Sequence, residues 1–435
     1  MDSVVLASIV LVSLLLLLLA SGVWVALSLL IVGMVLMGLF TTAPMGSLMA
    51  STLWDASWGW ALTSLPLFIW MGEILFRSNL SADMFQGIAP WVSRLPGRLL
   101  HVNILGCGVM AAVAGSSAVT CATIARMSVP ELSKRNYPVN MTLGTLAGSG
   151  TLGLLIPPSI VMIVYGVTAE QSIGHLFIAG ILPGLLLIAL YMGYTAIWSL
   201  INAREMPPPE PKVGFFEKIY RSRRLIPVAL LIAAVIGSIY GGIATPTEAA
   251  AVGVIGALVL AAVSGGLTWT IFLEGLMSAV RVSCMICFII GCAACLTIAV
   301  AFVDIPRTLA AWVDSLHLSS YALLAVLAVF LLILGCFLEG ISIIVLTSSV
   351  MLPMVQSAGI DLLWFGIFIV IMIEAAQITP PVGFNLFVLQ SITGKDIVTI
   401  TKAAMPYFFL LIILTVLITI FPQIVLVLPQ MMMQN

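Results

Sequence analysis

The chain has 435 residues, of which 62% are hydrophobic and only 8% are charged, and its mean hydropathy is +1.24. These values exclude a soluble protein and, with many apolar segments of helix length, predict an all-α polytopic membrane protein in a lipid bilayer. A GxxxxGK[ST] motif and a long polar domain are both absent from the sequence, which argues against ATP-driven work. The net charge of −1 points to no particular partner, and we expect no nucleic acid among the partners.

The first part of the chain is predicted to cross the bilayer three times before its first basic residue, Arg77. Segments 4–20 and 23–39 are separate spans, because one helix of their joint length would be too long for a bilayer. Segment 41–59 carries several tryptophans, which are typical of an interfacial stretch, and 61–76 spans again. Since no basic n-region precedes the first span, we expect it to be retained and not cleaved.

Residues 78–98 are polar enough to lie on the surface, and the segment that follows, 99–126, is predicted not to cross. Basic residues flank both of its ends, and basic flanks belong in the cytoplasm. The apolar run is interrupted in its middle at Gly115, Ser116 and Ser117. We therefore expect a re-entrant hairpin that enters from the cytoplasm and turns at this Gly-Ser-Ser tip.

Segment 140–166 is predicted to cross outward as a broken helix, because it contains Pro157 and Pro158. Two consecutive prolines remove two backbone donors and clash with the preceding turn. Within a bilayer, the freed backbone groups are tolerated only where protein or a watery cavity satisfies them. Segment 173–200 returns, and the polar stretch 203–224 is predicted to be a cytoplasmic linker, a topogenic loop in preference to a segment that binds anionic lipid.

The second half of the chain repeats this order of segments. Its predicted elements are spans at 225–240 and 248–264, an amphipathic arm around Glu274 and Arg281, a span at 283–302, a polar stretch at 304–314, a second re-entrant hairpin at 321–355, a helix at 362–390 broken at Pro380 and Pro381, and a closing span at 403–428. Thr245 and Glu248 have the spacing of a capping box at the start of the second span, which we favour over a functional site.

Four prolines of the first half recur in the second at a constant offset of 223 residues: Pro130 matches Pro353, Pro157 matches Pro380, Pro158 matches Pro381, and Pro183 matches Pro406. An identical offset without gaps indicates an internal duplication. The predicted repeats are 1–202 and 225–430, and an odd number of crossings inserts them in opposite directions. Of the sixteen Lys and Arg residues, only Arg307 is then expected outside. Inverted repeats with broken helices are typical of secondary transporters.

The hairpin tips and helix breaks are predicted to converge near the membrane midplane. Carbonyl and hydroxyl oxygens there suit a small hard cation such as Na⁺, and half-helix N-termini suit an anionic substrate. The predicted Na⁺ ligands are Gly115, Ser116, Ser117, Pro157, Glu339, Gly340, Ser342, Thr379, Val382 and Gly383. The predicted substrate ligands are Ser117, Thr151, Ser159, Asn385 and Arg126. Close helix packing is the alternative for the Gly-Ser-Ser tip, and a topogenic charge is the alternative for Arg126.

Two carboxylates lie within apolar segments, where they are costly unless paired, hydrated or neutralised, and so are functional candidates. Glu339, at a predicted hairpin tip, is interpreted as a cation ligand or proton acceptor. Glu374 either has such a role or hydrogen-bonds Gln377 or a neighbouring helix.

Four cysteines form two CxxC pairs within one apolar run: Cys284, Cys287, Cys292 and Cys295. Paired CxxC spacing is typical of a metal site. Here, however, no turn residue folds the pairs together, and helical periodicity places all four on one broad stripe. We favour helix packing over metal binding.

Five stretches resemble the large membrane subunit of the tripartite ATP-independent periplasmic (TRAP) transporters. They are AGSSAVTCATIA (114–125), GLLIPPSIVMIVYG (153–166), YGGIATPTEAAAVG (240–253), FLEGISIIVLTSSVMLP (337–353) and ITPPVGFNLFV (378–388), and they follow the family's order over nearly the whole chain. One departure is Glu339, where many relatives carry Asp.

The resemblance implies an importer of small organic anions, sialic acid or C4-dicarboxylates, in a bacterial inner membrane. It implies coupling to two or more Na⁺ ions without ATP, and an elevator motion in which both hairpins and both broken helices carry substrate past a fixed scaffold. It also implies two partners, a small membrane subunit of about four helices and a periplasmic substrate-binding protein.

Other functions remain as alternatives. One is a proton-coupled organic-anion transporter that acts alone. A channel would need a continuous polar path, whereas the predicted hairpins are discrete and opposed. An intramembrane enzyme is disfavoured because HExxH and GxSxG are absent from the sequence. An assembly scaffold would leave the inverted repeat and its broken helices without a purpose.

Overall fold

The computed structural model describes residues 2–77, 80–208, 214–223, 225–315, 319–380 and 383–434. Every regular element within these ranges is a helix, which confirms the predicted all-α class. Within the same ranges, six helices are long and apolar enough to cross a membrane, and the number rises to nine if each sharply bent pair counts as one span.

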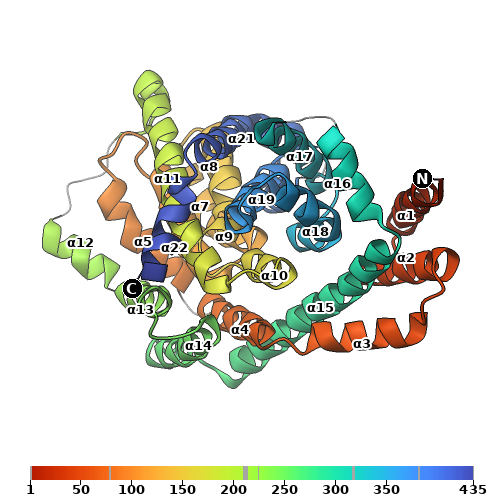
Figure 1. Ribbon diagram of the computed structural model, residues 1–435. Helices are drawn as coiled ribbons and strands as arrows, with labels where there is room; N and C mark the ends of the chain where they lie inside the picture. The colour runs from red at the N-terminus through yellow and green to blue at the C-terminus, as the bar shows by residue number, and fades with distance from the viewer. Residues whose placement is uncertain are drawn as a thin grey trace.

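One group of helices, which we call the scaffold, comes from the start of each half of the chain. Its members are α1 (Asp2–Ala20), α2 (Val25–Phe40), α3 (Met45–Ser57), η1 (Trp60–Thr63), α4 (Ser64–Arg77), α13 (Ile226–Tyr240), α14 (Pro246–Val263), α15 (Trp269–Phe302) and α16 (Ile305–Ser315). α15 packs against α2, α3 and α4 and runs along one side of the molecule (Figure 1). The contact is close because Gly33 has no side chain: a Cβ there would lie 3.3 Å from the Cα of Leu296.

The remaining helices form a second group, the core, with two similar halves. The first half comprises α6 (Leu100–Ala114), α7 (Ser117–Lys134), α8 (Val139–Gly150), α9 (Leu152–Leu155), α10 (Ile160–Thr168) and α11 (Ile173–Ile201). The second comprises α17 (Ser320–Gly335), α18 (Gly340–Ser357), α19 (Leu362–Gln377), α20 (Phe384–Thr393), α21 (Ile397–Ile420) and α22 (Gln423–Gln434). α19 is buried in the centre of this group and contacts α9, α10, α11, α17, α18 and α21.

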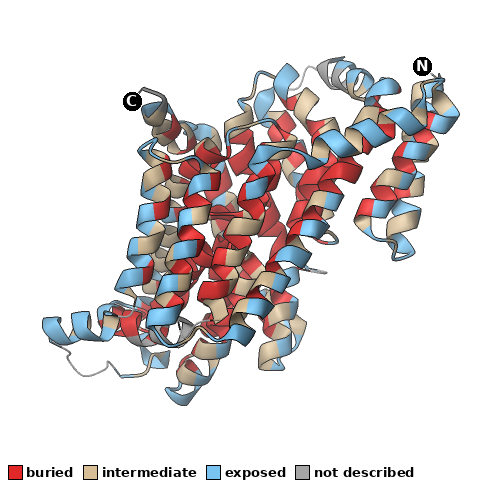
Figure 2. Ribbon diagram, turned by 90° about the horizontal axis from the view of Figure 1, so that it is seen from below, coloured by how far each residue is buried: buried red, intermediate tan, exposed pale blue. Residues whose placement is uncertain are grey.

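Helix starts in the core follow the offset seen among the prolines. α7 begins at Ser117 and α18 at Gly340, and α8 begins at Val139 and α19 at Leu362, so both pairs are 223 residues apart. Figure 2 places both chain ends at one end of the molecule, and the helix that follows the first repeat at the opposite end. Such a placement is the one that an odd number of crossings per repeat requires.

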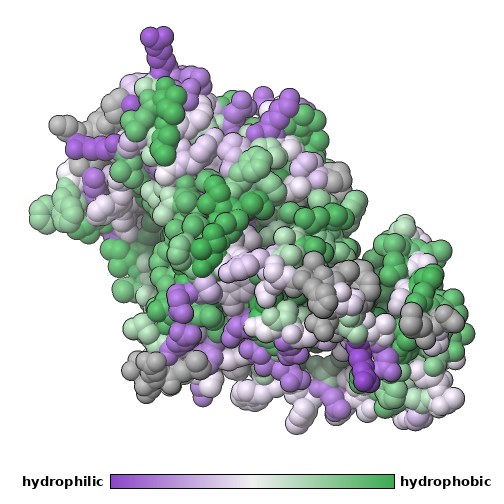
Figure 3. All heavy atoms as spheres, turned by 45° about the horizontal axis from the view of Figure 1, so that its top comes forward, coloured by the Kyte–Doolittle hydropathy of each residue, from purple (hydrophilic) through white to green (hydrophobic). Residues whose placement is uncertain are grey.

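The outer surface is that of a membrane protein. Large apolar side chains are exposed on several helices, among them Leu17 (63%), Trp24 (75%) and Val263 (84%). Figure 3 shows apolar side chains over much of one face, with polar ones gathered towards its edges. The aromatic side chains Trp54, Trp58 and Trp60 are also exposed, as expected of an interfacial stretch.

The structure differs from the sequence prediction in several boundaries. The predicted arm around Glu274 and Arg281 and the span at 283–302 form one helix, α15, because no proline or turn residue separates them. The predicted closing span at 403–428 starts earlier, at Ile397, and is divided between α21 and α22 at Phe421 and Pro422. The predicted first hairpin ends later, since α7 continues through Pro130 to Lys134.

Two polar segments contain helices that the sequence prediction missed. α5 (Leu80–Val92) lies in the segment predicted to be on the surface, yet Ile88 and Val92 belong to a buried apolar cluster with α6. α12 (Phe215–Ser222) lies in the predicted linker and packs against α5, where Ser222 Oγ donates a hydrogen bond to the Gly87 carbonyl (2.7 Å). Arg224, Lys212 and the rest of 209–213 lie outside the described residues.

Candidate functional site

The first hairpin turns at Gly115, as predicted. Gly115 ends α6 in the left-handed conformation (φ +58°), and a Cβ at this position would lie 2.7 Å from the Pro158 carbonyl oxygen. Its own carbonyl accepts a long hydrogen bond from Ile160 N (3.5 Å). Glycine is required here because no other residue tolerates both the turn and the approach of that backbone. The tip of the first hairpin is therefore seated on the break of the neighbouring helix.

That break separates α9 from α10, and the two parts of the helix are bent by 40°. Ile156, Pro157, Pro158 and Ser159 form the non-helical link. Ser159 caps α10, since its Oγ accepts a hydrogen bond from Met162 N (3.4 Å). On the other side of the break, Gly153 lets α9 approach the hairpin so closely that a Cβ would lie 2.5 Å from the Ser116 carbonyl oxygen.

The second hairpin and the second break meet in the same way. α17 ends at Gly335, and a Cβ there would lie 2.3 Å from Ala376 Cβ on α19. Cys336 Sγ contacts the Pro380 carbonyl oxygen at 3.4 Å. A Cβ on Gly383 would lie 2.8 Å from the Gln377 carbonyl oxygen and 2.9 Å from that of Thr379. Main-chain oxygens thus converge on Gly383.

Contacts between the two repeats join these parts into one centre. Ser117, at the start of α7, donates a hydrogen bond through its hydroxyl to the Gln377 side-chain oxygen at the end of α19. Gly340, at the start of α18, lies against Val161 of α10 and Ile373 of α19, where a Cβ would be 3.6 Å and 2.8 Å from their side chains. Each hairpin tip therefore contacts the broken helix of the other repeat.

Three polar side chains in the core are fully buried and have atoms without a hydrogen-bond partner. They are Thr120 on α7, Glu374 on α19 and Asn385 on α20, all at 0% exposure. Neither oxygen of Glu374 and neither amide atom of Asn385 has a partner. α7 and α20 pack against each other. Since buried polar groups are nearly always satisfied, these orphaned atoms mark places that a ligand or water can fill.

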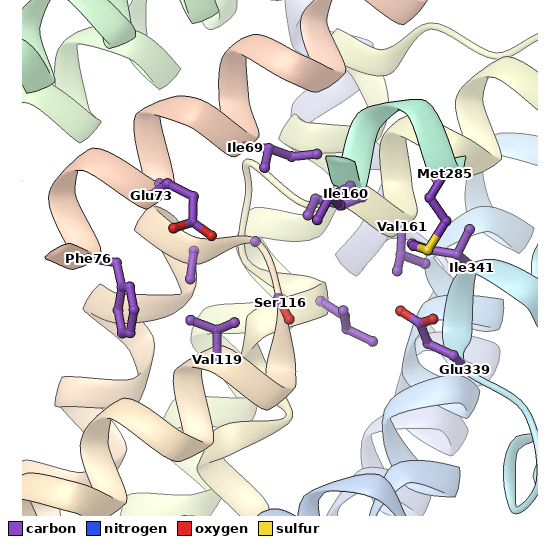
Figure 4. Close-up of a pocket in the computed structure, with 15 residues that line it drawn as sticks. Ile69, Glu73, Phe76, Ser116, Val119, Ile160, Val161, Met285, Glu339 and Ile341 are labelled. Carbon is purple, nitrogen blue, oxygen red and sulfur yellow. The ribbon is translucent and has the colours of Figure 1, made fainter. Parts of the chain in front are cut away.

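A cavity of about 230 Å³ opens between the core and the scaffold. Figure 4 shows Glu73 of α4 and Glu339 of the second hairpin on opposite sides of it, with Ser116 of the first hairpin between them. Met285 of α15 and Ile341 of α18 complete the far wall. Both hairpin tips thus reach a space that is bounded on its outer side by the scaffold.

Glu73 is a residue that the sequence prediction missed, although a carboxylate inside a predicted span is itself the signal. It is not a bare charge: its Oε2 lies 2.9 Å from Arg77 Nε, and its Oε1 accepts a hydrogen bond from Ser278 Oγ (2.7 Å). Arg77 also pairs with Glu274 at 2.6 Å. The amphipathic start of α15 therefore supplies partners for a charged group on α4.

Most predicted site residues are brought together, and a few are not. The structure places Gly115, Ser116, Ser117, Pro157, Glu339, Gly340, Ser342, Thr379, Gly383 and Asn385 at the tips and breaks. Val382 and Pro381 lie outside the described residues. Arg126 is exposed in the second half of α7, away from the Gly-Ser-Ser tip.

Two further predicted ligands already have partners. The Thr151 hydroxyl donates to the Gly148 carbonyl (2.7 Å) and lies 3.5 Å from the Tyr191 hydroxyl. Ser159 is occupied as the cap of α10. Thr379 also returns its hydroxyl to its own helix, at the Ala375 carbonyl (2.7 Å). For these residues the main-chain oxygens, more than the hydroxyls, are free for a ligand.

The predicted capping box and the cysteine cluster have clear structural places. Thr245 and Glu248 form both hydrogen bonds of the box at the start of α14, which confirms that prediction. The four cysteines of the CxxC pairs all lie on α15. No group of three or more His, Cys, Asp or Glu side chains among the described residues has the geometry of a metal site.

Residues 12–424 match the family model described as tripartite ATP-independent periplasmic transporter, DctM component. A C4-dicarboxylate TRAP transporter large permease from Pseudomonas aeruginosa is 33% identical over 382 residues, which cover 88% of this chain and 89% of that protein. An isethionate TRAP transporter permease, DctMQ, from Oleidesulfovibrio alaskensis is 30% identical over 399 residues, which cover 90% of this chain and 62% of that protein.

The fold also resembles a solved structure. The crystal structure of the YdaH transporter from Alcanivorax borkumensis superposes with a TM-score of 0.68, covering 91% of this chain and 96% of that one. The two sequences are 15% identical, so the similarity concerns the fold alone.

Proposed function

Because the chain belongs to the DctM component family of TRAP transporters, we propose that it is the transport subunit of a Na⁺-coupled importer of small organic anions. C4-dicarboxylates and sialic acid are the proposed cargoes, and a bacterial inner membrane is the proposed location. The observation that carries this proposal is the meeting of two hairpin tips and two helix breaks in one buried centre.

The centre has the donor set that Na⁺ binding requires. Na⁺ is a hard cation and prefers oxygen ligands, and it would supply positive charge beside an anionic cargo. In the first repeat, Gly115 and Ser117 with the carbonyls around Pro157 would hold it. In the second repeat, the carbonyls of Gln377 and Thr379, which converge on Gly383, would do so.

The anionic cargo is proposed to bind at the starts of α7 and α18. Both helices have 18 residues and begin at a hairpin tip, and neither N-cap residue, Ser116 or Glu339, forms a side-chain capping hydrogen bond. The first-turn amide groups of such helices attract anions. Asn385, with both amide atoms unpartnered, is the proposed polar contact on α20.

Transport is proposed to follow an elevator motion of the core against the scaffold. The cavity that separates Glu339 from Glu73 lies at the boundary of these two groups, and the hairpin tips and breaks all belong to the core. We propose two partners, a small membrane subunit and a periplasmic binding protein that delivers the cargo.

The test is uptake of a radiolabelled C4-dicarboxylate or sialic acid into proteoliposomes that contain this chain and its two partners. An inward Na⁺ gradient should drive accumulation, and a K⁺ gradient of equal size should not. Equal uptake with the two cations would remove the Na⁺ coupling. Uptake that follows an inward proton gradient without Na⁺ would instead favour the proton-coupled alternative.

A further inference from the structure

We propose that Glu374 is a proton-binding site connected to the end of the core at Pro96 through a series of buried hydroxyl groups on α8, α11 and α21. Nothing in the proposed Na⁺ or cargo sites assigns this residue a role. The inference stands on the position of the side chains and does not rest on the proposed function.

The surroundings of Glu374 favour a neutral side chain. It is fully buried on α19, and neither oxygen has a hydrogen-bond partner of normal geometry. The groups that face it are the backbone amides of Leu154 and Leu155 on α9 and the phenol of Tyr191 on α11. Next to it, Ile373 packs on Gly340 of α18, which adds only apolar surface. A bare carboxylate in such a site would lack compensation for its lost hydration, so the group retains its proton.

The hydroxyl series begins at Tyr191. Its hydroxyl lies 3.5 Å from Thr151 Oγ1, and its ring packs edge-on against the ring of Tyr407 with centroids 5.3 Å apart. The Tyr407 hydroxyl lies 3.0 Å from Thr195 Oγ1. All four side chains are fully buried. A hydroxyl can accept a proton on its oxygen while it releases its own, so the series can pass a proton without a net change in any member.

From Thr195 the series reaches an exposed turn of the chain. A Cβ on Gly97 would lie 3.0 Å from Thr195 Cγ2 and 2.7 Å from His101 Nε2, so these side chains meet around Gly97. His101 Nε2 is hydrogen-bonded to the Pro96 carbonyl at 2.5 Å, and its Nδ1 has no partner. Pro96 itself is exposed. An imidazole at this point can exchange protons between the interior and water.

Infrared spectroscopy of the purified full-length protein tests the proposal without needing transport. A protonated carboxyl has a carbonyl stretch that a carboxylate lacks. The wild type should show this band at neutral pH, Glu374→Gln should lose it, and Glu339→Gln should retain it. A wild-type spectrum without the band, or a band that survives Glu374→Gln, would overturn the proposal.

Deuterium exchange tests the connection in a protein that still contains Glu374. After transfer to D₂O the band shifts as the proton is replaced, and Tyr407→Phe should slow this shift several-fold. The matched control is Tyr165→Phe, which removes another buried tyrosine hydroxyl, one that donates to the Leu362 carbonyl (2.7 Å). Equal exchange rates in wild type and Tyr407→Phe would rule out the proposed route, even if Glu374→Gln failed to fold.

Discussion

Ser117 carries the one side-chain hydrogen bond given above that joins a hairpin tip of one repeat to the helix break of the other. Its partner, Gln377, is buried at the end of α19, directly before the second break. Removing one partner of a buried hydrogen bond leaves the other unsatisfied, which costs about 1–3 kcal/mol. The position of the first hairpin against the second break therefore depends on a single hydroxyl.

Replacing this hydroxyl should weaken ion binding. For Ser117→Ala we expect the Na⁺ concentration at half-maximal uptake to rise at least about fivefold, since about 1 kcal/mol is about that factor in affinity. The measurement is the Na⁺ titration of uptake in proteoliposomes. Ser57→Ala on α3 is the control, because its hydroxyl bonds only its own helix at the Leu53 carbonyl (2.7 Å). An unchanged titration for Ser117→Ala would remove this residue from the site.

Gly153 should tolerate no side chain at all. A Cβ would lie 2.5 Å from the Ser116 carbonyl and 2.7 Å from Ser117 Cα, and backbone atoms of the tip cannot move aside without displacing the hairpin. Gly153→Ala should therefore lower the melting temperature in detergent and abolish uptake. Gly193→Ala on α11 is the control, because nothing lies within 4 Å of its Cβ position. Equal effects of the two substitutions would contradict the close approach.

At the level of elements, the contact between α4 and α15 depends on a charged network inside an apolar scaffold. Arg77 pairs with Glu73 of its own helix and Glu274 of α15, and Ser278 completes the shell of Glu73. The side chains of Glu73 and Arg77 are only 22% and 28% exposed. A helix of 34 residues is thereby tied to α4 by polar groups as well as by apolar packing.

Breaking this network on one side should cost more than removing both charges. Arg77→Gln leaves a partly buried carboxylate without its cation, and we expect a loss of about 1–3 kcal/mol in unfolding free energy. The double variant Glu73→Gln with Arg77→Gln should recover part of that loss. Thermal unfolding of the four proteins in a double-mutant cycle gives the coupling. Strictly additive effects would show that the pair contributes no interaction of its own.

For the whole molecule, the boundary between core and scaffold is the surface where the proposed motion would occur. Met285 belongs to the scaffold and Ile341 to the core, and both line the same wall of the cavity in Figure 4. A covalent link between them would hold the two groups in the relative position described here.

We therefore expect cross-linking across this boundary to stop transport. In a variant without the native cysteines, Met285→Cys with Ile341→Cys, joined by a short bifunctional thiol reagent, should lose uptake. Leu154→Cys with Val161→Cys is the control pair, because both residues belong to the core and both approach the Gly340 position. Cross-linking that pair should spare uptake. Unimpaired transport across a confirmed Met285–Ile341 link would contradict the elevator motion.

Much of this architecture could be predicted from local chemistry. Paired prolines end a helix wherever they stand, so the breaks at Pro157 and Pro380 were visible in the sequence, and the offset of 223 residues shared by four prolines recurs in the helix starts. The capping box of Thr245 and Glu248 likewise needs only four consecutive residues. Apolar segment length was enough for the class of the protein, because a bilayer sets the length of a span.

Only the tertiary structure decided which of these pieces touch. No local signal shows that Ser117 meets Gln377, 260 residues away, or that Glu73 and Glu339 face one cavity. It also decided that Arg126 points away from the centre and that α12 packs on α5. The physical reason is range: helix ends, breaks and spans depend on neighbouring residues, whereas a buried site depends on the long-range packing that brings distant segments together.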